Sequence, residues 1–445
     1  MIELESPVER VILVGAQIKG PNGRNNGNGS SAAPAPSRSQ VMGEHLEELE
    51  RLADTAGAVV VGQLTQQIDR PNPATYLGKG KIEELSQAIV DTGATLVIFD
   101  DELTPAQGKN VEDATGQRVM DRAELILDIF ATRARSSEAR MQVELAQLQY
   151  MLPRLTRMWT HLEKFRGGIG VRGPGETQLE TDRRLINNRI KLLRQRLQDV
   201  QKSREVQRTS RKGEFRASLV GYTNAGKSSV LRSLSGSGSI VVEDRLFATL
   251  DPLTREVQLA DNSSILLTDT VGFIRKLPHH LVASFRATLE EVGEADLLLH
   301  VIDISHPAWD EQRTVVEGVL GEIGAGGKPV LNVFNKIYLV SEGDLIGLES
   351  SIRNLLPDSV FVSAAVRGGL DPLQRALLSA IRARMPITEI RVPVTAGKLL
   401  AEVHREAEVI DQMHEGDELV LHARMNASIA GRLRKAGAAV GPSEG

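Results

Sequence analysis

The sequence contains no cysteine, few aromatic residues and no long hydrophobic run. Because its 445 residues include no Cys, disulfide bonds and thiolate metal sites are excluded, which suits a reducing compartment. Aromatic residues make up 3% of the chain, which disfavours stacking platforms for single-stranded nucleic acid. No apolar run approaches the roughly 20 residues of a membrane span, and the acidic start lacks a secretory pattern. We therefore expect a cytoplasmic protein of about three domains.

Charge is unevenly distributed along the chain. The formal net charge is −5, yet the stretch from Arg154 to Lys212 carries 16 lysine and arginine residues against 6 acidic ones. Such asymmetry favours a polyanionic partner at one surface. Charge alone leaves open a second interpretation, an arginine-rich helix face that is simply solvated.

Three segments in the first half of the chain have different patterns. Residues 1–135 alternate strand-like and helix-like runs, beginning with a strand at 10–14, which predicts an α/β domain with a parallel sheet. Residues 21–40 are rich in Asn, Gly, Ser, Ala and Pro and are predicted to be a disordered insert. Residues 136–212 form two helical patterns separated by a Gly-rich loop at 166–175 that carries Arg166 and Arg172. We interpret them as a helical hairpin with a basic tip, the alternative being a spacer between two unrelated helices.

A complete phosphate-binding loop occupies residues 221–228. An apolar strand pattern precedes it and a helical pattern follows it, which is the context that this motif requires. Gly226 lets the backbone curl around the β-phosphate, Lys227 reaches the β and γ oxygens, and Ser228 offers its hydroxyl to Mg²⁺. The residues assigned to the loop are Gly221, Tyr222, Thr223, Asn224, Ala225, Gly226, Lys227 and Ser228.

Two further motifs are typical of the Mg²⁺ and γ-phosphate side of a GTPase. The strand at 265–269 ends in Asp269, which is positioned to hold a Mg²⁺-bound water, and Gly272 frees a backbone N–H for the γ-phosphate. Between this motif and the phosphate loop, Thr249 is the expected second Mg²⁺ hydroxyl. We assign the catalytic roles to Lys227, Thr249 and Gly272, and the metal to Ser228 and Thr249. The remaining nucleotide-binding residues of this region are Phe247, Ala248, Leu250, Asp251, Thr270 and Val271.

The base-reading side departs from the usual pattern. Asn335, Lys336 and Ile337 follow an apolar strand, but Tyr338 stands where an aspartate would accept hydrogen bonds from guanine N1–H and the 2-amino group. Losing that charged acceptor reduces discrimination between purines. Glu342 or Asp344 would be substitutes from the next turn. A last loop follows the strand at 359–361 and is expected to reach the base O6 with its N–H groups; its residues are Ser363, Ala364 and Ala365.

The catalytic side also lacks the side-chain amide that orients the attacking water in many GTPases. Phe273 occupies the position in which many GTPases place a water-orienting glutamine, and an apolar ring cannot orient water. We therefore expect slow intrinsic hydrolysis that depends on a partner. Residues 214–387 as a whole predict a P-loop GTPase domain. Residues 391–445 predict a small α+β domain, with a strand continuing through 398–405 and a helix at 427–436.

Together these motifs resemble the HflX family of ribosome-associated GTPases, within the Obg–HflX group. The similar stretches outside the nucleotide site are residues 76–85, 121–130, 142–148, 167–180 and 182–184. Residues 247–251 and 269–273 are also similar to that family's switch sequences, so Phe273 is typical there, whereas Tyr338 replaces an aspartate.

The resemblance implies a Mg²⁺-dependent GTPase that binds GTP and GDP and associates with the large ribosomal subunit and its rRNA. It further implies a role in splitting or rescuing ribosomes or in subunit biogenesis. We expect the protein to be monomeric. Two alternatives remain at this stage. One is an NTPase that uses ATP as well as GTP, and the other is an RNA-binding assembly factor whose nucleotide site is not catalytic.

Overall fold

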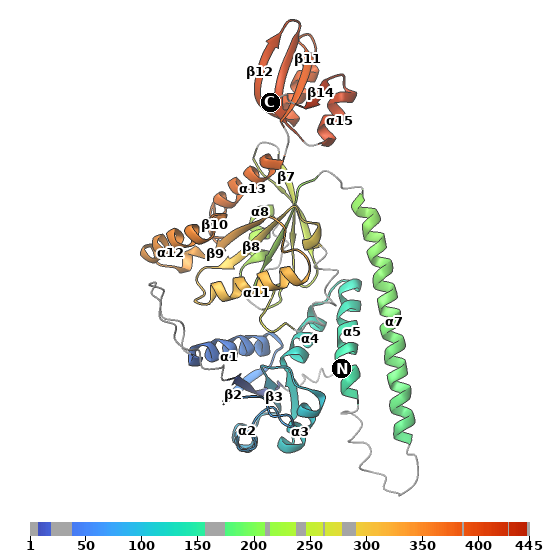
Figure 1. Cartoon of the computed structure of the whole chain (residues 1–445), viewed down its shortest axis with the longest axis vertical. Coiled ribbons are helices and arrows are strands. Elements are labelled where there is room, and N and C mark those ends of the chain that lie inside the picture. Colours follow the sequence, from blue (N-terminus) through green and yellow to red (C-terminus); the bar gives the residue numbers. More distant parts are fainter. Residues whose placement is uncertain are drawn as a thin grey trace, which may run out of the picture. The chain divides into compact units, whose positions relative to one another are not determined.

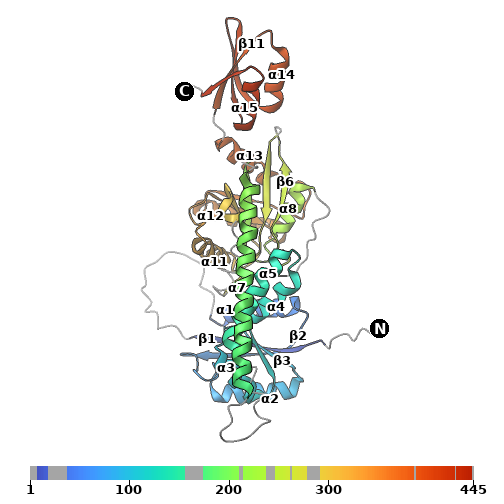
Figure 2. The same cartoon turned by 90° about the vertical axis from the view of Figure 1, so that its right-hand side faces the viewer.

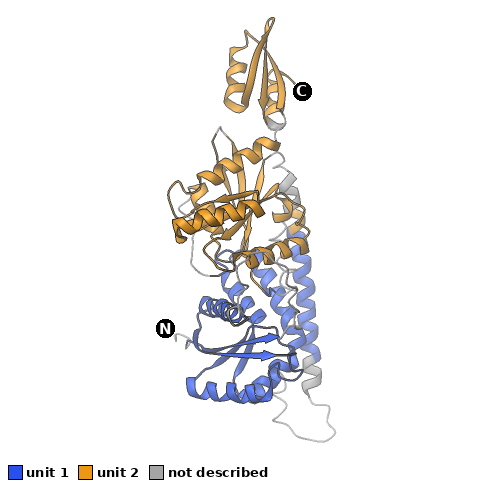
Figure 3. Ribbon diagram, turned by 60° about the vertical axis from the view of Figure 1, so that its left-hand side comes forward, with its two compact units in different colours: residues 1–200, 245–250, 276–285 blue, residues 201–244, 251–275, 286–445 orange. Residues whose placement is uncertain are grey.

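The computed structural model describes residues 8–18, 38–155, 174–209, 214–236, 246–260, 263–277, 291–384, 387–425 and 427–442. The chain divides into two compact units (Figure 3). Unit 1 comprises residues 1–200, 245–250 and 276–285, and unit 2 comprises residues 201–244, 251–275 and 286–445. Within the described residues, no helix is long and apolar enough to cross a membrane.

Unit 1 is built on a four-stranded parallel sheet of order β2-β1-β3-β4. Its strands are β1 (Arg10–Ile18), β2 (Val59–Ile68), β3 (Leu96–Phe99) and β4 (Arg118–Asp121). The helices that alternate with them are α1 (Arg38–Thr55), α2 (Lys79–Thr92), α3 (Pro105–Thr115) and α4 (Arg122–Arg133). The alternation of apolar runs and helical repeats therefore produces the expected parallel sheet, because parallel strands need crossover connections.

Local sequence signals set the ends of these helices. The Thr104 hydroxyl oxygen accepts a hydrogen bond from the Gln107 N–H, and the Gln107 side-chain oxygen accepts one from the Thr104 N–H, so α3 begins with a capping box. The Asp121 carboxylate caps α4 by accepting a hydrogen bond from the Glu124 N–H. Gly93 ends α2 in the left-handed conformation that glycine adopts without steric cost.

Two long helices follow the sheet. Helix α5 (Ser137–Met151) leads into a short 3-10 turn, η1 (Leu152–Arg154), and α7 (Pro174–Thr209) runs alongside α5 in both views (Figures 1 and 2). Leu145 of α5 and Ile190 and Leu193 of α7 form the buried centre of their contact. The apolar stripe predicted for the second helix therefore packs on the first, as in a helical hairpin. The predicted loop at 166–175 lies outside the described residues except for its last two, which begin α7.

Unit 2 contains a six-stranded sheet of order β10-β9-β8-β5-β7-β6. Its strands are β5 (Arg216–Gly221), β6 (Leu253–Gln258), β7 (Ser264–Asp269), β8 (Leu297–Asp303), β9 (Val330–Asn335) and β10 (Ser359–Phe361). Its helices are α8 (Lys227–Ser235), α11 (Trp309–Glu322), α12 (Glu342–Leu355) and α13 (Asp371–Arg384), and η2 (Ile337–Leu339) is a 3-10 turn. All pairings are parallel except β6 with β7, an edge strand that the sequence interpretation missed.

The chain ends in a four-stranded antiparallel sheet of order β12-β13-β11-β14. Its elements are β11 (Ile387–Pro393), α14 (Gly397–Glu406), β12 (Glu408–Glu415), β13 (Glu418–Arg424), α15 (Ala427–Lys435) and β14 (Ala439–Pro442). The fold is therefore that of a P-loop GTPase with an N-terminal α/β region and a C-terminal α+β region, as the sequence predicts.

Two local predictions were wrong. The predicted strand at 398–405 is helix α14, because Leu399 and Val403 recur at helical spacing and both are buried in the C-terminal core. The predicted insert at 21–40 ends too late, since α1 begins at Arg38. Arg and Gln are good helix formers, and the composition of the preceding stretch does not determine where the helix starts. The rest of that insert lies outside the described residues.

Candidate functional site

The phosphate loop connects β5 to α8 at the carboxyl end of the parallel strands. Gly226 caps α8 with φ of 96°, and a Cβ at this position would lie 2.3 Å from Asn335 Nδ2. Any side chain at this position would therefore be strained and would also collide with the base-side loop. The N-terminus of α8 presents its unsatisfied N–H groups at this loop, as an anion site requires.

Lys227 is buried, with 6% of its surface exposed, and has no carboxylate within ion-pair distance among the described residues. Its Nζ donates to the carbonyl oxygens of Gly221 (3.1 Å) and Tyr222 (2.7 Å). Burial lowers the pKa of Lys227 to about 8, and the nearby Asp269 carboxylate partly opposes that effect. The ammonium is therefore held inside the loop by neutral oxygens, where the negative oxygens of a nucleotide would stabilise its charge.

Ser228 and Asp269 converge on one point of this loop. Ser228 Oγ donates to Asp269 Oδ2 at 2.6 Å, although β7 brings the aspartate from 41 residues further along the chain. A hydroxyl and a carboxylate are oxygen ligands of the kind that Mg²⁺ prefers. The described residues contain no group of three His, Cys, Asp or Glu side chains that could hold a metal by themselves. These two residues therefore fit an ion whose other ligands are waters and phosphate oxygens.

The segment after β7 is paired with the start of the phosphate loop. Phe273 N–H donates to Gly221 O (3.1 Å), and Thr223 N–H donates to Phe273 O (2.7 Å). This pairing brings Gly272 so close that a Cβ on it would lie 2.8 Å from Thr223 Cγ2 and 3.1 Å from Lys227 Nζ. Only a glycine fits between the two loops here. The approach of its backbone N–H to a γ-phosphate remains a prediction.

Thr223 and Phe273 complete the surroundings of Lys227. Thr223 is buried, and its Oγ1 has no hydrogen-bond partner within the described ranges. An unsatisfied buried hydroxyl is costly, and a phosphate oxygen would satisfy it. Phe273 is fully buried, so its ring contributes packing and no polar group to the site.

Thr249 lies in a segment that groups with unit 1. The segment's Phe247 packs its ring edge-on against Phe130 of α4, with the ring centroids 4.6 Å apart. Lys276 also belongs to unit 1, where it forms ion pairs of 2.6 Å with both Asp100 and Asp101. The role of Thr249 as a metal ligand remains a prediction.

On the base side, Asn335 ties three loops together. Its Nδ2 donates to Ala225 O of the phosphate loop (3.0 Å), and its Oδ1 accepts from Ala364 N–H of the last loop (3.1 Å). With only 2% of its surface exposed, the amide has both hydrogen bonds shielded from water. The geometry matches the linking role that the sequence assigns to this asparagine.

The other residues of the base side make fewer buried hydrogen bonds than Asn335 does. Lys336 adopts a left-handed backbone with φ of 64°, and its Nζ forms an ion pair with Asp303 at 2.7 Å. Tyr338 follows in the 3-10 turn η2 and is 51% exposed. Ser363 is buried, and its Oγ has no hydrogen-bond partner in the part of the chain that the structure describes.

Two residues near the site were missed by sequence reasoning. Asp303 ends β8, holds Lys336, and accepts hydrogen bonds from Ser305. His300 is buried on the same strand, where burial lowers its pKa to about 3, with Arg313 and Lys227 contributing. Asp303 could have been found from one signal: it ends the apolar strand that precedes, in the sequence, the strand of the base-reading motif.

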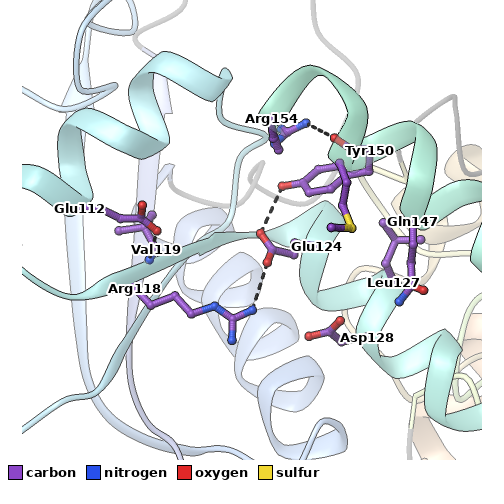
Figure 4. A pocket seen from close by; sticks show the side chains of 10 residues that line it. Glu112, Arg118, Val119, Glu124, Leu127, Asp128, Gln147, Tyr150 and Arg154 are labelled. Atoms are coloured by element: carbon purple, nitrogen blue, oxygen red, sulfur yellow. Dashed lines mark hydrogen bonds and ion pairs between the residues drawn. The ribbon is translucent and has the colours of Figure 1, made fainter. Parts of the chain in front are cut away.

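A separate cavity of about 530 Å³ lies in unit 1, between the β4–α4 region and α5 (Figure 4). Glu124 is central to it, accepting from Arg118 (3.1 Å) and from the Tyr150 hydroxyl (3.4 Å). Burial raises the pKa of Glu124, and Arg118 opposes that shift. None of the residues predicted for nucleotide binding lines this cavity, so the nucleotide site and this cavity are distinct.

The phosphate loop, the paired Gly272 segment and the Asn335 link define the class of this protein as a P-loop GTPase. Comparison with known families agrees with this assignment. Residues 43–131 match the family described as GTP-binding GTPase N-terminal, residues 133–211 its middle region, and residues 216–336 the 50S ribosome-binding GTPase family.

Curated relatives identify the family. The chain is 47% identical over 393 residues to the GTPase HflX of Caldanaerobacter subterraneus, covering 88% of this chain and 90% of that protein. It is 44% identical over 385 residues to the GTPase HflX of Escherichia coli, covering 86% and 90%. The chain therefore belongs to the HflX family of GTPases. A GDP-bound GTP-binding protein from Sulfolobus solfataricus is a structural neighbour, with 25% identity, a TM-score of 0.43, and coverage of 84% of this chain and 98% of that one.

Proposed function

We propose that this GTPase acts on the large ribosomal subunit, binding its rRNA through the hairpin of α5 and α7 and splitting or rescuing ribosomes. The observation that carries the proposal is the charge of α7. Six exposed cations along it form no ion pair among the described residues: Arg183, Arg184, Lys191, Arg194, Arg196 and Lys202. Arg189 does form one, with Glu144 at 2.6 Å.

Exposed cations without ion-pair partners along one helix are suited to binding the phosphate groups of RNA. Each phosphate that a lysine or arginine neutralises releases counterions, so a row of such contacts gives strong, salt-dependent binding. Double-stranded rRNA is recognised mainly through its backbone and shape, which requires no aromatic platform. The match of residues 216–336 to a 50S ribosome-binding GTPase family supports the same partner.

The nucleotide site would drive this association. Lys227 and the N–H groups of the phosphate loop would bind the phosphates, and the Gly272 N–H would approach the γ-phosphate. Ser228 and Thr249 would hold Mg²⁺, with Asp269 orienting its water. The ion, when bound, neutralises charge that develops on the phosphate oxygens. Because Phe273 offers no group to orient the attacking water, we propose that the subunit completes the site and accelerates hydrolysis.

Cosedimentation with isolated large subunits tests the proposal. Replacing Arg184, Lys191 and Arg194 of α7 together by glutamate should weaken binding at least tenfold and leave GDP affinity unchanged. The matched control replaces Arg367, Lys398 and Lys435, three exposed cations of unit 2, by glutamate and should bind normally. If the α7 variant binds like the control variant, the hairpin is not the contact.

Turnover and light scattering separate the remaining candidates. GTP hydrolysis should rise at least tenfold when large subunits are added, whereas an assembly factor with a non-catalytic site would show no turnover. Addition of the GTP-bound protein to intact ribosomes should lower their light scattering as they split. Binding without any loss of scattering would favour a role in subunit biogenesis.

A further inference from the structure

Two hydrogen bonds join the base-side loops. Ile337 N–H donates to Val362 O (3.4 Å), and Asn335 bonds Ala364 N–H. Tyr338 and Ser363 each directly follow one member of the Ile337–Val362 pair. We expect an acidic side chain at 338 to reach the Ser363 hydroxyl, which is buried without a hydrogen-bond partner in the described part of the chain.

The carboxylates near Tyr338 in the sequence or on the neighbouring strand either make other interactions or are exposed to solvent. Asp344 accepts from the Ser341 hydroxyl (2.6 Å), and its own N–H donates to Ser341 Oγ, so it is fixed at the start of α12. Asp303 is held by Lys336 and Ser305. Glu342 is exposed at the first position of α12. Asp344, one of the two substitutes expected from the sequence, is therefore already engaged.

Tyr338 cannot replace the missing acceptor. Guanine presents two adjacent donors, N1–H and the 2-amino group, and a carboxylate accepts both with charge-assisted bonds about twice as strong as neutral ones. The phenol oxygen of Tyr338 is a single neutral atom, and the residue as a whole is 51% exposed. A site discriminates strongly against an analogue only when loss of the analogue's group leaves buried polar atoms unpaired.

We propose that this chain selects its nucleotide by the 6-oxo group of the purine and not by the 2-amino group, so that guanine, hypoxanthine and xanthine nucleotides bind alike. The inference rests on the assignment of 335–338 and 363–365 as the base-reading loops. The hydrogen bonds of Asn335 to Ala225 O and Ala364 N–H hold these loops together, and neither bond involves residue 338. Ala364 N–H donates to Asn335, whereas Ala365 N–H has no hydrogen bond within the described residues. We therefore assign the O6 contact to Ala365 N–H.

Titration of the full-length protein with GDP, IDP, XDP and ADP tests the proposal. IDP and XDP should bind within about threefold of GDP, because the 2-position meets no charged acceptor. ADP should bind at least thirtyfold more weakly, because its 6-amino group meets an N–H donor. IDP binding thirtyfold more weakly than GDP, or ADP binding as well as GDP, would overturn the proposal. Failure of all four to bind would instead refute the nucleotide site itself.

Variants at three positions sharpen the test. Tyr338→Asp should raise the GDP-to-IDP preference to thirtyfold or more, whereas Leu339→Asp, which adds the same charge at the neighbouring exposed residue, should not change it. Glu342→Gln should also leave the preference unchanged. A preference that is present in the natural chain and lost in Glu342→Gln would mean that Glu342 reads the base, and the proposal would be wrong.

Ser363 provides an internal check. In the natural chain, Ser363→Ala should weaken GDP binding only slightly, because its hydroxyl has no hydrogen-bond partner among the described residues. In the Tyr338→Asp background, the same substitution should weaken GDP about fivefold, because the hydroxyl then supports the new carboxylate. Equal effects in the two backgrounds would contradict the predicted contact between positions 338 and 363.

Discussion

The phosphate side and the base side of this site are built differently, although they meet at one asparagine. On the phosphate side, Lys227, Asp269 and Thr223 are buried, Ser228 already bonds Asp269, and Gly226 and Gly272 leave no space for a side chain. On the base side, Tyr338 is half exposed and Ser363 Oγ lacks a partner within the described residues.

This difference indicates where binding energy arises. A preorganised, water-excluded set of donors stabilises developing and resident charge far more than exposed neutral groups can. We infer that the phosphates supply most of the affinity and that the base supplies little discrimination. Four changes test this contrast, from the largest expected effect to the smallest.

Lys227→Met should have the largest effect. The substitution preserves the buried volume and removes the only ammonium inside the loop, so kcat/KM for GTP should fall about 1,000-fold, equivalent to about 4 kcal/mol. Steady-state kinetics on protein with an unchanged melting temperature gives the measurement. A loss below tenfold would mean that the phosphate side is not the main source of stabilisation.

Asn335→Ala should damage both sides at once. It removes two buried hydrogen bonds and leaves Ala225 O and Ala364 N–H unpaired, which should cost about 2–3 kcal/mol of stability. GDP affinity should fall at least tenfold as well. The control is Asn332→Ala on the same strand, where the buried Oδ1 has no partner in the described part of the chain and the cost should be smaller. Equal losses in stability would show that Asn335 does not link the loops.

His300 makes the phosphate-side core sensitive to acid. Its folded pKa, about 3, lies below the ordinary value of 6.5, so only the unfolded chain takes up the proton as pH falls through this window. The free energy of unfolding should therefore drop by up to about 1.4 kcal/mol per pH unit between pH 6 and 4, relative to His300→Gln. Denaturant melts without nucleotide measure the slope. His404→Gln, an exposed histidine on α14, should keep the slope of the natural chain.

Tyr338→Phe should have the smallest effect. If the phenol oxygen contributes nothing to base recognition, GDP affinity changes by less than twofold. Isothermal titration at constant salt is sufficient to measure it. A fivefold loss or more would show that the hydroxyl bonds the base, and the base side would then be more selective than we infer.

Much of this contrast can be predicted from the sequence. The phosphate loop is recognisable because strand, glycines, lysine and helix occur in contiguous residues, and Tyr338 is noticeable because it interrupts an equally local motif. Parallel strands in both α/β regions follow from alternating apolar and helical runs. The predicted domain boundaries and metal ligands remain predictions.

Other features depend on contacts that a linear pattern does not contain. The pairing of Asp303 with Lys336 joins the ends of two strands, and the unsatisfied Ser363 hydroxyl is defined by what surrounds it. The edge strand β6 is only half buried and therefore lacks a strong apolar pattern. Helix α14 is short, and short apolar runs are ambiguous between strand and helix.

A single ligand series measures the contrast most directly. The affinities of GDP, GMP and IDP for the natural chain with Mg²⁺ compare removal of the β-phosphate with removal of the 2-amino group. We predict that GMP binds at least 1,000-fold more weakly than GDP, a difference of about 4 kcal/mol, while IDP binds within about threefold. GMP within tenfold of GDP, or IDP more than thirtyfold weaker, would contradict the account.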